Sequence, residues 1–178
     1  WAATINFLED AKNDTVRYAI LEGSTAYNLN GIVRISTASA SGSGNDNLMI
    51  DNCYIRGNTT LPPTAIYALG TSGRANDNIT ISNNRIYDFH LNGTTGYGIH
   101  VSTYNNAWTI SGNHIYQTAS RASSNGINRY GIYINSTTAP SDKFTISNNY
   151  IGGSTQNAGS TAMTYTGNVN QTYTGIYL

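Results

Sequence analysis

The sequence predicts an all-β parallel solenoid, in which the 178-residue chain winds so that each coil adds one strand to each of two or three parallel sheets. Two observations lead to this class. The first is a phrase that recurs as NITISNNRIYDF, AWTISGNHIYQT and KFTISNNYIGGS, starting at residues 78, 107 and 143. The second is the alternation of apolar and polar residues inside the phrase, which is the period of a strand with one buried face.

The recurring phrase defines two columns of apolar residues. Aligned on the isoleucine two positions before the Asn pair, the first column is Ile50, Ile81, Ile110 and Ile146, with Val16 above them. The next apolar position gives Leu21, Ile55, Ile86, Ile115 and Ile151. Leucine-rich repeats would need more Leu and a helical period, and a propeller would need antiparallel strands joined by tight hairpins. Because like residues follow one another at about the spacing of one turn, parallel stacking of coils is favoured.

A second, shorter phrase follows each copy of the first and predicts another strand. Its leading column is Ile5, Ile32, Ile66, Ile99, Ile132 and Ile176. The steps between these positions are unequal, which predicts fixed strands joined by loops of different length. The longest predicted loops are 119–130 and 152–173, and the count of phrases predicts about five to six coils.

The paired Asn residues predict a sharp corner between two sheets. Asn tolerates the left-handed backbone conformation, and its amide can form local hydrogen bonds. Stacked coils would place Asn84, Asn113 and Asn149 above one another, so their amides are predicted to form a ladder. Cys53 and Ala19 hold the same position in earlier coils, where the ladder should stop. A role as simple turn formers, without a ladder, is the alternative.

The phrases ITISNNRI, WTISGNHI, FTISNNYI and LMIDNCYI resemble those of the right-handed parallel β-helix superfamily, the pectate-lyase-like fold, over nearly the whole chain. The Asn/Thr/Ser-rich composition is also similar to that of β-helix segments of large secreted surface proteins of Bacteroidota-type bacteria. The resemblance implies the fold and leaves the activity open, because the superfamily contains both polysaccharide-degrading enzymes and structural proteins.

Composition excludes several classes of protein. Only 10% of the residues are charged, with nine Lys and Arg against nine Asp and Glu, so no basic face for nucleic acid is expected. The apolar runs are too short to span a membrane. The one cysteine, Cys53, cannot form an internal disulfide and is expected to be a small buried apolar residue.

No catalytic residue and no metal site are predicted. The motifs NTD, DD, GHG and RIK of the superfamily's polygalacturonases are absent, and the carboxylates are scattered along the chain. Asp46 and Asp77 occupy matching NDN corners, where they could share a calcium ion, but calcium sites usually gather more ligands. The three histidines have no zinc-ligand spacing. The expected cofactor is therefore none, with calcium at these two aspartates as the alternative.

One outward column is a candidate glycan-stacking face, namely Tyr67, His100, Tyr133 and Tyr177, with Val33 predicted above them. Flat rings in a row can stack on the apolar faces of sugars. The alternative is that Tyr is a good strand former whose rings stabilise the sheet without any ligand. The neighbouring column of Tyr54, Arg85, His114 and Tyr150 is predicted to be a solvated face.

These observations favour a non-catalytic, extracellular or cell-surface β-helix segment of structural or adhesin type, with weak glycan contacts. Residues 1–178 are expected to be one segment of a longer chain, with further coils of the same parent as its partners, because the sequence starts without Met and stops inside a strand phrase. The alternative is a polysaccharide lyase or glycoside hydrolase with its active site outside this segment or in the long loops. A phage-tail or surface-layer component, which trimeric assembly would indicate, is a third reading.

Overall fold

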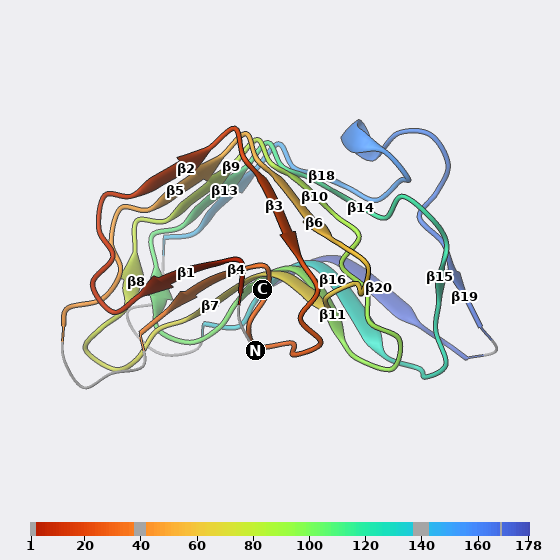
Figure 1. The fold of residues 1–178 in the computed structure, drawn as a ribbon, viewed down its shortest axis with the longest axis horizontal. Coiled ribbons are helices and arrows are strands. Elements are labelled where there is room, and N and C mark those ends of the chain that lie inside the picture. Colours follow the sequence, from red (N-terminus) through yellow and green to blue (C-terminus); the bar gives the residue numbers. More distant parts are fainter. Residues whose placement is uncertain (1–2, 38–41, 137–142, 168) are drawn as a thin grey trace.

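The computed structural model describes residues 3–37, 42–136, 143–167 and 169–178, and these wind into a solenoid of three parallel sheets (Figure 1). The first sheet has the order β1 (Ile5–Leu8), β4 (Val33–Ser36), β7 (Thr64–Leu69), β11 (Gly96–Val101), β16 (Asn128–Ile134) and β20 (Thr172–Tyr177). The second contains β2 (Thr15–Arg17), β5 (Met49–Asp51), β9 (Thr80–Ser82), β13 (Thr109–Ser111) and β17 (Thr145–Ser147). The third contains β3 (Ile20–Gly23), β6 (Tyr54–Gly57), β10 (Arg85–Tyr87), β14 (His114–Tyr116) and β18 (Tyr150–Ile151).

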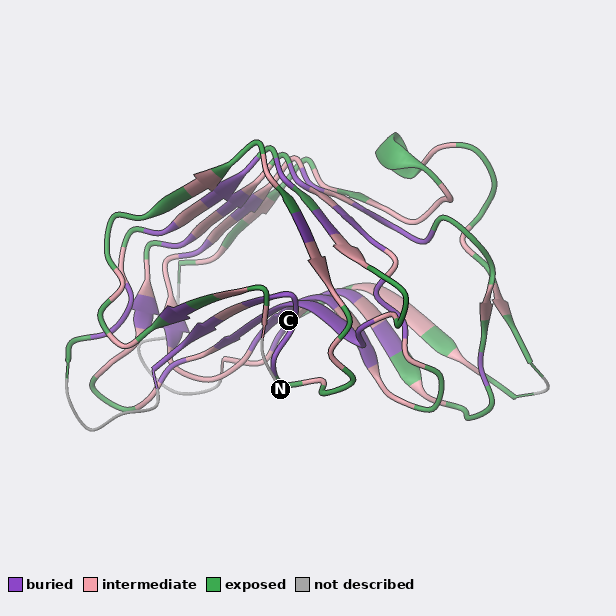
Figure 2. Cartoon of the chain, viewed as in Figure 1, coloured by how far each residue is buried: buried purple, intermediate pink, exposed green. Residues whose placement is uncertain are grey.

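The predicted fold class is confirmed, and the coil count is slightly too high. The solenoid makes about four turns rather than five to six coils, and the strands at the two ends of each sheet are paired on one side only. Figure 2 shows the consequence for burial: β2 and β17, at the two ends of the second sheet, are more exposed than β9 and β13 between them.

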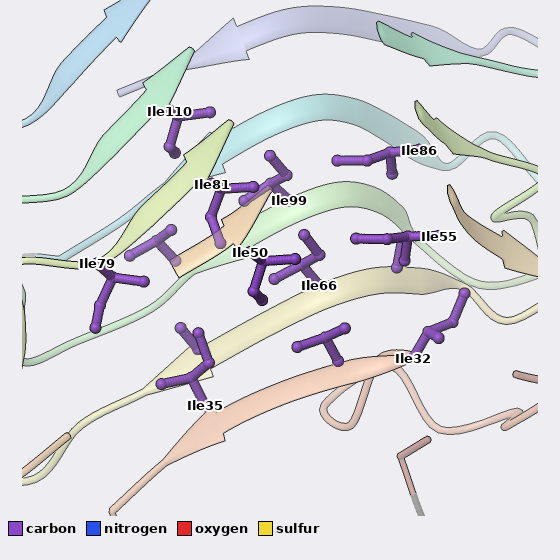
Figure 3. Close-up of a cluster of buried hydrophobic side chains, with 14 of the residues drawn as sticks. Ile32, Ile35, Ile50, Ile55, Ile66, Ile79, Ile81, Ile86, Ile99 and Ile110 are labelled. Carbon is purple, nitrogen blue, oxygen red and sulfur yellow. The ribbon is translucent and has the colours of Figure 1, made fainter. Parts of the chain in front are cut away.

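Both apolar columns of the recurring phrase lie in register on the inner face. Ile81 pairs with Ile50 and Ile110, and Ile86 pairs with Ile55 and Ile115. All six side chains have no exposed surface, and Figure 3 shows several of them facing one another across the interior. Burying an isoleucine side chain contributes roughly 1.5–3 kcal/mol to folding, so these columns are a main source of stability.

The register predicted for the strand at 31–35 is wrong by one residue. Val33, rather than Ile32, pairs with both Ile5 and Ile66, and Arg34 rather than Val33 therefore lies beside Tyr67. The predicted alignment would have turned Arg34 toward the interior. A one-residue slip moves every side chain of a strand to the other face, and burial of an unpaired charge costs more than any gain from aligning isoleucines.

Two columns of left-handed residues bound the second sheet. Before it lie Asn13, Asn47, Asn78, Ala107 and Lys143, all with φ between 55° and 71°. After it lie Tyr18, Asn52, Asn83, Gly112 and Asn148, with φ between 53° and 66°. The second residue of each Asn pair is therefore not the one that turns the chain. The first residue adopts the left-handed conformation, which leaves the side chain of the second free to bond to neighbouring coils.

The segments predicted as the longest loops contain short ordered elements. β15 (Arg121–Ala122) pairs with β19 (Tyr165–Thr166), and a 3-10 turn, η1 (Gln156–Ala158), precedes β19. A further pair, β8 (Asn76–Asp77) with β12 (Asn105–Asn106), lies at the NDN corner. Among the described residues, no helix has the length and apolar character needed to cross a bilayer.

Candidate functional site

The predicted glycan-stacking residues lie in one column on the outer face of the first sheet. Tyr67 pairs with His100, His100 with Tyr133, and Tyr133 with Tyr177. Two further rings, Tyr97 and Tyr130, pair beside this column and stack on each other at 5.4 Å. The six rings together are called the aromatic face below.

Glycine makes room for these two adjacent columns of rings. Gly98 interrupts the alternation between Tyr97 and His100, and Gly131 does the same in the next coil. A Cβ atom at Gly98 would lie 2.5 Å from the carbonyl oxygen of Gly131 and 2.9 Å from the side chain of Ile115. The strand therefore bends only where no side chain is present, and this bend directs both Tyr97 and His100 outward.

Only part of the aromatic face is accessible to a ligand. Tyr67 and His100 are 3% and 7% exposed, and the ring of Tyr97 covers His100 at a centroid distance of 4.3 Å. Burial lowers the pKa of His100 to about 4, so its ring is neutral near pH 7. Tyr133 and Tyr177 stack at 4.8 Å, and Tyr177 is 46% exposed. Stacking on a glycan stays a prediction, which the geometry restricts to the end of the column at Tyr133 and Tyr177.

The Asn residues of the recurring phrase form a continuous chain of amide contacts, called ladder one. Asn84 Nδ2 donates to Asn113 Oδ1 and Asn113 Nδ2 donates to Asn149 Oδ1, both at 3.0 Å. Each amide also donates to a main-chain carbonyl of the preceding coil, as Asn113 does to Ile81 at 2.8 Å. At the other end, the backbone N–H of Cys53 donates to Asn84 Oδ1, and Cys53 itself is a buried free cysteine.

A second ladder lies at the opposite corner and was missed by the sequence reasoning. Asn45 Nδ2 donates to Asn76 Oδ1 at 2.8 Å, and Asn76 Nδ2 donates to Asn105 Oδ1 at 2.9 Å. All three residues are fully buried. The sequence signal is the first Asn of NDN, NDN and NNA at 45–47, 76–78 and 105–107. This Asn repeats in register, but the corner was interpreted only through its aspartates. This row is called ladder two.

Most of the described carboxylates contact a neighbouring coil instead of one another. Asp51 accepts hydrogen bonds from Arg17 on one side and from Ser82 and Asn83 on the other. The remaining pairs follow the same pattern: Glu22 with Arg56, Asp88 with Arg121, Asp46 with Lys12, and Asp10 with the backbone of Ser43. Asp142 lies outside the described residues.

For the calcium ion predicted as an alternative at Asp46 and Asp77, the described part of the chain offers no third acidic, His or Cys ligand. The two residues are adjacent in register, but Lys12 Nζ lies 3.2 Å from Asp46 Oδ2 and supplies a positive charge there. Within the described ranges, no group of three or more His, Cys, Asp or Glu residues has the arrangement of a metal site. Burial, together with the charge of Asp46, raises the pKa of Asp77.

The column predicted to be a solvated face lines a shallow groove. Tyr54, Arg85 and His114 border a cavity of about 360 Å³ together with residues of the neighbouring corner. The Arg85 guanidinium lies 4.6 Å from the Tyr54 ring centre, and His114 stacks on Tyr150 at 5.0 Å. His114 Nδ1 accepts a hydrogen bond from the backbone N–H of Asn157, and burial lowers the pKa of this histidine. Arg85 and His114 thus mainly contact the rings of Tyr54 and Tyr150 in the same column.

Parallel strands stacked coil on coil, inward isoleucines and polar ladders at the corners define a parallel β-helix protein. The family model for a right-handed β-helix region matches residues 7–174, so the chain belongs to this family. No curated protein and no solved structure matches the chain. The narrower resemblance to bacterial surface proteins stays a prediction.

Proposed function

We propose that this chain is a non-catalytic, extracellular structural segment of a cell-surface protein, which holds other parts of that protein at a distance and contacts polysaccharide weakly. The observation that carries the proposal is the direction of its polar contacts. Side-chain hydrogen bonds of the two ladders, of Asp51 and of Glu22 link residues about one coil apart in the sequence. Such contacts stabilise the stacking of each coil on the next.

This use of carboxylates differs from that expected of a glycoside hydrolase. Hydrolysis of a glycosidic bond needs a pair of carboxyl groups roughly 5–10 Å apart that flank the substrate. Asp51 and Asp88 instead each bind a cation of an adjacent coil, Arg17 and Arg121. The attraction within these ion pairs stabilises the stacking of adjacent coils. In repeat proteins, stability is approximately a sum of such nearest-neighbour interfaces.

An extracellular location is supported by the chemistry of the surface. With 10% charged residues and a formal net charge of zero, the outer face consists largely of neutral hydrogen-bonding groups. Contacts made by neutral groups depend little on ionic strength, because there is little charge to screen. Weak polysaccharide contact is supported by the stacked and partly exposed Tyr133 and Tyr177.

The test combines a binding assay with a degradation assay on one panel of polysaccharides. We expect the chain to co-sediment weakly with some members and to leave their lengths unchanged in size-exclusion chromatography. Binding should fall in Tyr133→Ser and Tyr177→Ser. It should not fall in Tyr18→Ser, because Tyr18 is 75% exposed but lies away from the aromatic face. Shortening of any polysaccharide by the purified chain would overturn the proposal and support an enzyme.

A further inference from the structure

A groove on the outer face of the third sheet carries polar groups that the stacking of coils does not use. It has a volume of about 360 Å³, at the lower end of the range for small-molecule sites. Its walls come from the middle strands β6, β10 and β14, each paired on both sides, from the corner toward the second sheet, and from η1. In Figure 1, η1 lies outside the sheet beside β18 and β14. The lining includes Asn52, Tyr54, Asn83, Arg85, His114 and Gln156.

Arg85 supplies a positive charge that no carboxylate of the described residues neutralises. Its partners in register are Tyr54 and His114, and its guanidinium carbon lies over the Tyr54 ring at 4.6 Å. By contrast, Arg56 of the same sheet forms an ion pair with Glu22 of the adjacent coil. One N–H of Arg85 donates to the Tyr54 hydroxyl. The ring thus holds the guanidinium in place, and its other N–H groups can bind an oxyanion in a forked geometry.

His114 adds a second donor next to Arg85. Its Nδ1 accepts a hydrogen bond at 2.9 Å from the backbone N–H of Asn157 in η1. A ring nitrogen that accepts carries no proton, so the neutral ring has its proton on Nε2. Burial and the charge of Arg85 both lower the pKa of His114, which keeps the ring neutral near pH 7. Arg85 and His114 are adjacent in register, so their donors lie in neighbouring strands of one wall.

The corner beside Arg85 supplies hydrogen-bond acceptors. Asn52 Nδ2 and Asn83 Nδ2 both donate to Asp51, so the carbonyl oxygen of each exposed amide stays available. Gly112 takes the same left-handed position in the next coil, and a Cβ atom there would lie 2.5 Å from Asn83 Oδ1. Glycine therefore leaves this oxygen uncovered, and a hydroxyl group of a ligand can donate to it.

The groove lies where the recurring phrase departs from its own pattern. Two coils read SNNR and SNNY at 82–85 and 147–150, whereas the coil between them reads SGNH at 111–114. Both changed residues, Gly112 and His114, thus belong to one coil, and the η1 turn contacts the same coil through His114. Coil stacking alone would be satisfied by a third copy of Asn at 112. Local departures from a consistent pattern are expected at functional sites.

We propose that this groove binds a small hydroxylated oxyanion, whose negative group accepts from the Arg85 guanidinium and His114 Nε2 and whose hydroxyl donates to Asn83 Oδ1. A hydrogen bond from arginine to an oxyanion is charge-assisted and about twice as strong as one between neutral groups. A carboxylate and a phosphate ester share the anionic chemistry required. The site goes beyond the spacer function and does not depend on it.

The first test follows the histidine ring signals of the full chain by NMR while one of four probes is added. D-glucuronate is a hydroxylated carboxylate, glucose 6-phosphate a hydroxylated phosphate, D-glucose lacks the anion, and acetate lacks the hydroxyls. We expect saturable shifts of the His114 signals with one or both hydroxylated anions, with affinity at least about tenfold above that for glucose or acetate. His90 and His100 are each 7% exposed, and their signals should stay in place. Loss of a signal in His114→Gln assigns it.

Three variants decide whether the groove residues hold the anion. Arg85→Gln should weaken binding of the anionic probe at least about tenfold, because it removes the charge. Asn83→Gly copies the residue of the next coil, and it should weaken binding of the hydroxylated anion while leaving the response to acetate unchanged. Arg74→Gln removes an equal charge in the connection between the first and second sheets, so it is the matched control and should bind normally.

Absence of a saturable shift of the His114 signals with both hydroxylated anions at millimolar concentration would overturn the proposal, and this result needs no binding variant to fold. Shifts of the His90 or His100 signals instead would place binding elsewhere and also overturn it. So would equal binding by Arg85→Gln and the unmodified chain, or an equal loss in Arg74→Gln, which would indicate attraction by net charge alone. The spacer function stands or falls separately, on polysaccharide cleavage.

Discussion

The two sides of the third sheet are built in opposite ways. On the side facing the second sheet, two residues connect the strands in every coil, and the first of them is always left-handed. On the side facing the first sheet, the connection ranges from the short 58–63 to the long 152–171. We call these the constant corner and the variable side. The constant corner contains ladder one, whereas the variable side contains a cavity of about 330 Å³ that is lined by Arg129, Tyr165 and residues of the long connection.

This difference shows how one coil can both bind tightly to its neighbours and carry a loop of variable length. At the constant corner each amide bonds to the same amide of the next coil, so a change in one coil affects the coils on both sides of it. On the variable side the chain leaves the stack and returns, and its length is limited little by the neighbours, since loop entropy grows slowly with length. Stability is therefore expected to be concentrated at the constant corner and new chemistry on the variable side.

The largest effect is expected from Asn113→Ala, which removes the central amide of ladder one. The backbone and side-chain amides of Asn84 both lose their acceptor, and the Ile81 carbonyl loses a donor. Buried groups left unpaired cost about 1–3 kcal/mol each, so we expect a loss of about 3 kcal/mol in the free energy of unfolding. Urea denaturation followed by circular dichroism measures it.

The matched change on the variable side is Gln156→Ala, on an exposed residue of η1. Surface substitutions of this kind usually change stability by less than about 0.5 kcal/mol. If both variants lost the same stability, the two sides of the sheet would not differ in the way proposed, and the amide ladder would be a consequence of stacking rather than a cause.

The constant corner is also the part of the fold that the sequence predicted best. Each coil there repeats an inward aliphatic residue in register and three coils repeat the ladder Asn, so a single chain contains several copies of one signal. Ile81, Ile110 and Asn113 could be placed without any structure for this reason. The error at Ile32 arose where two neighbouring apolar residues both offered an alignment, and the choice was decided by which face Arg34 takes.

The variable side was predicted least well, because its chemistry occurs once. Arg129 and Tyr173 form no column of like residues, and nothing in the one-dimensional pattern relates them to each other or to the cavity. β15 and β19 were read as loops, since two-residue strands have no period to detect. The aromatic face was found as a column, but the burial of His100 depends on Tyr97, which lies beyond the bend at Gly98.

The next effect concerns acid stability at the constant corner and uses Asp51. Burial raises the pKa of this carboxyl, but hydrogen bonds from Ser82, Asn83, Asn52 and Arg17 outweigh burial and lower it to about 2, from 3.8 in the unfolded chain. Because the folded-state pKa is the lower one, this contribution is complete above about pH 4 and is lost as the pH falls toward 2.

Urea midpoints measured from pH 7 to pH 2 test this contribution. We expect Asp51→Asn to be less stable than the unmodified chain at neutral pH and to show a flatter decline between pH 4 and pH 2. Asp14→Asn, at an exposed carboxylate of the preceding coil, should follow the unmodified chain. A parallel decline in Asp51→Asn would mean that this carboxylate does not contribute to acid sensitivity.

Asp77, at the opposite corner of the second sheet, is expected to act with the reverse sign. Burial and the charge of Asp46 raise its pKa, so the folded chain binds this proton more readily than the unfolded chain and ionisation weakens the fold. We therefore expect Asp77→Asn to raise the urea midpoint near pH 7, with a gain that shrinks as the pH falls through the raised pKa. A lower midpoint at pH 7 would contradict this assignment.

The smallest effect is expected from Ala107→Asn, which tests whether the corner before the second sheet tolerates any residue or favours Asn. Ala107 has φ 56°, a conformation that disfavours a residue with a Cβ, while three other coils use Asn13, Asn47 and Asn78 there. Asn adopts this conformation more readily, and Asn47 Nδ2 already donates to Asn13 Oδ1 at 3.2 Å in the stack. We expect a gain of about 0.5–1 kcal/mol in the free energy of unfolding.

Ala162→Asn, at an exposed position outside both left-handed columns, is the matched control and should change stability by less than about 0.5 kcal/mol. A loss of stability in Ala107→Asn would show that packing against Trp108, rather than backbone conformation, selects alanine at this corner.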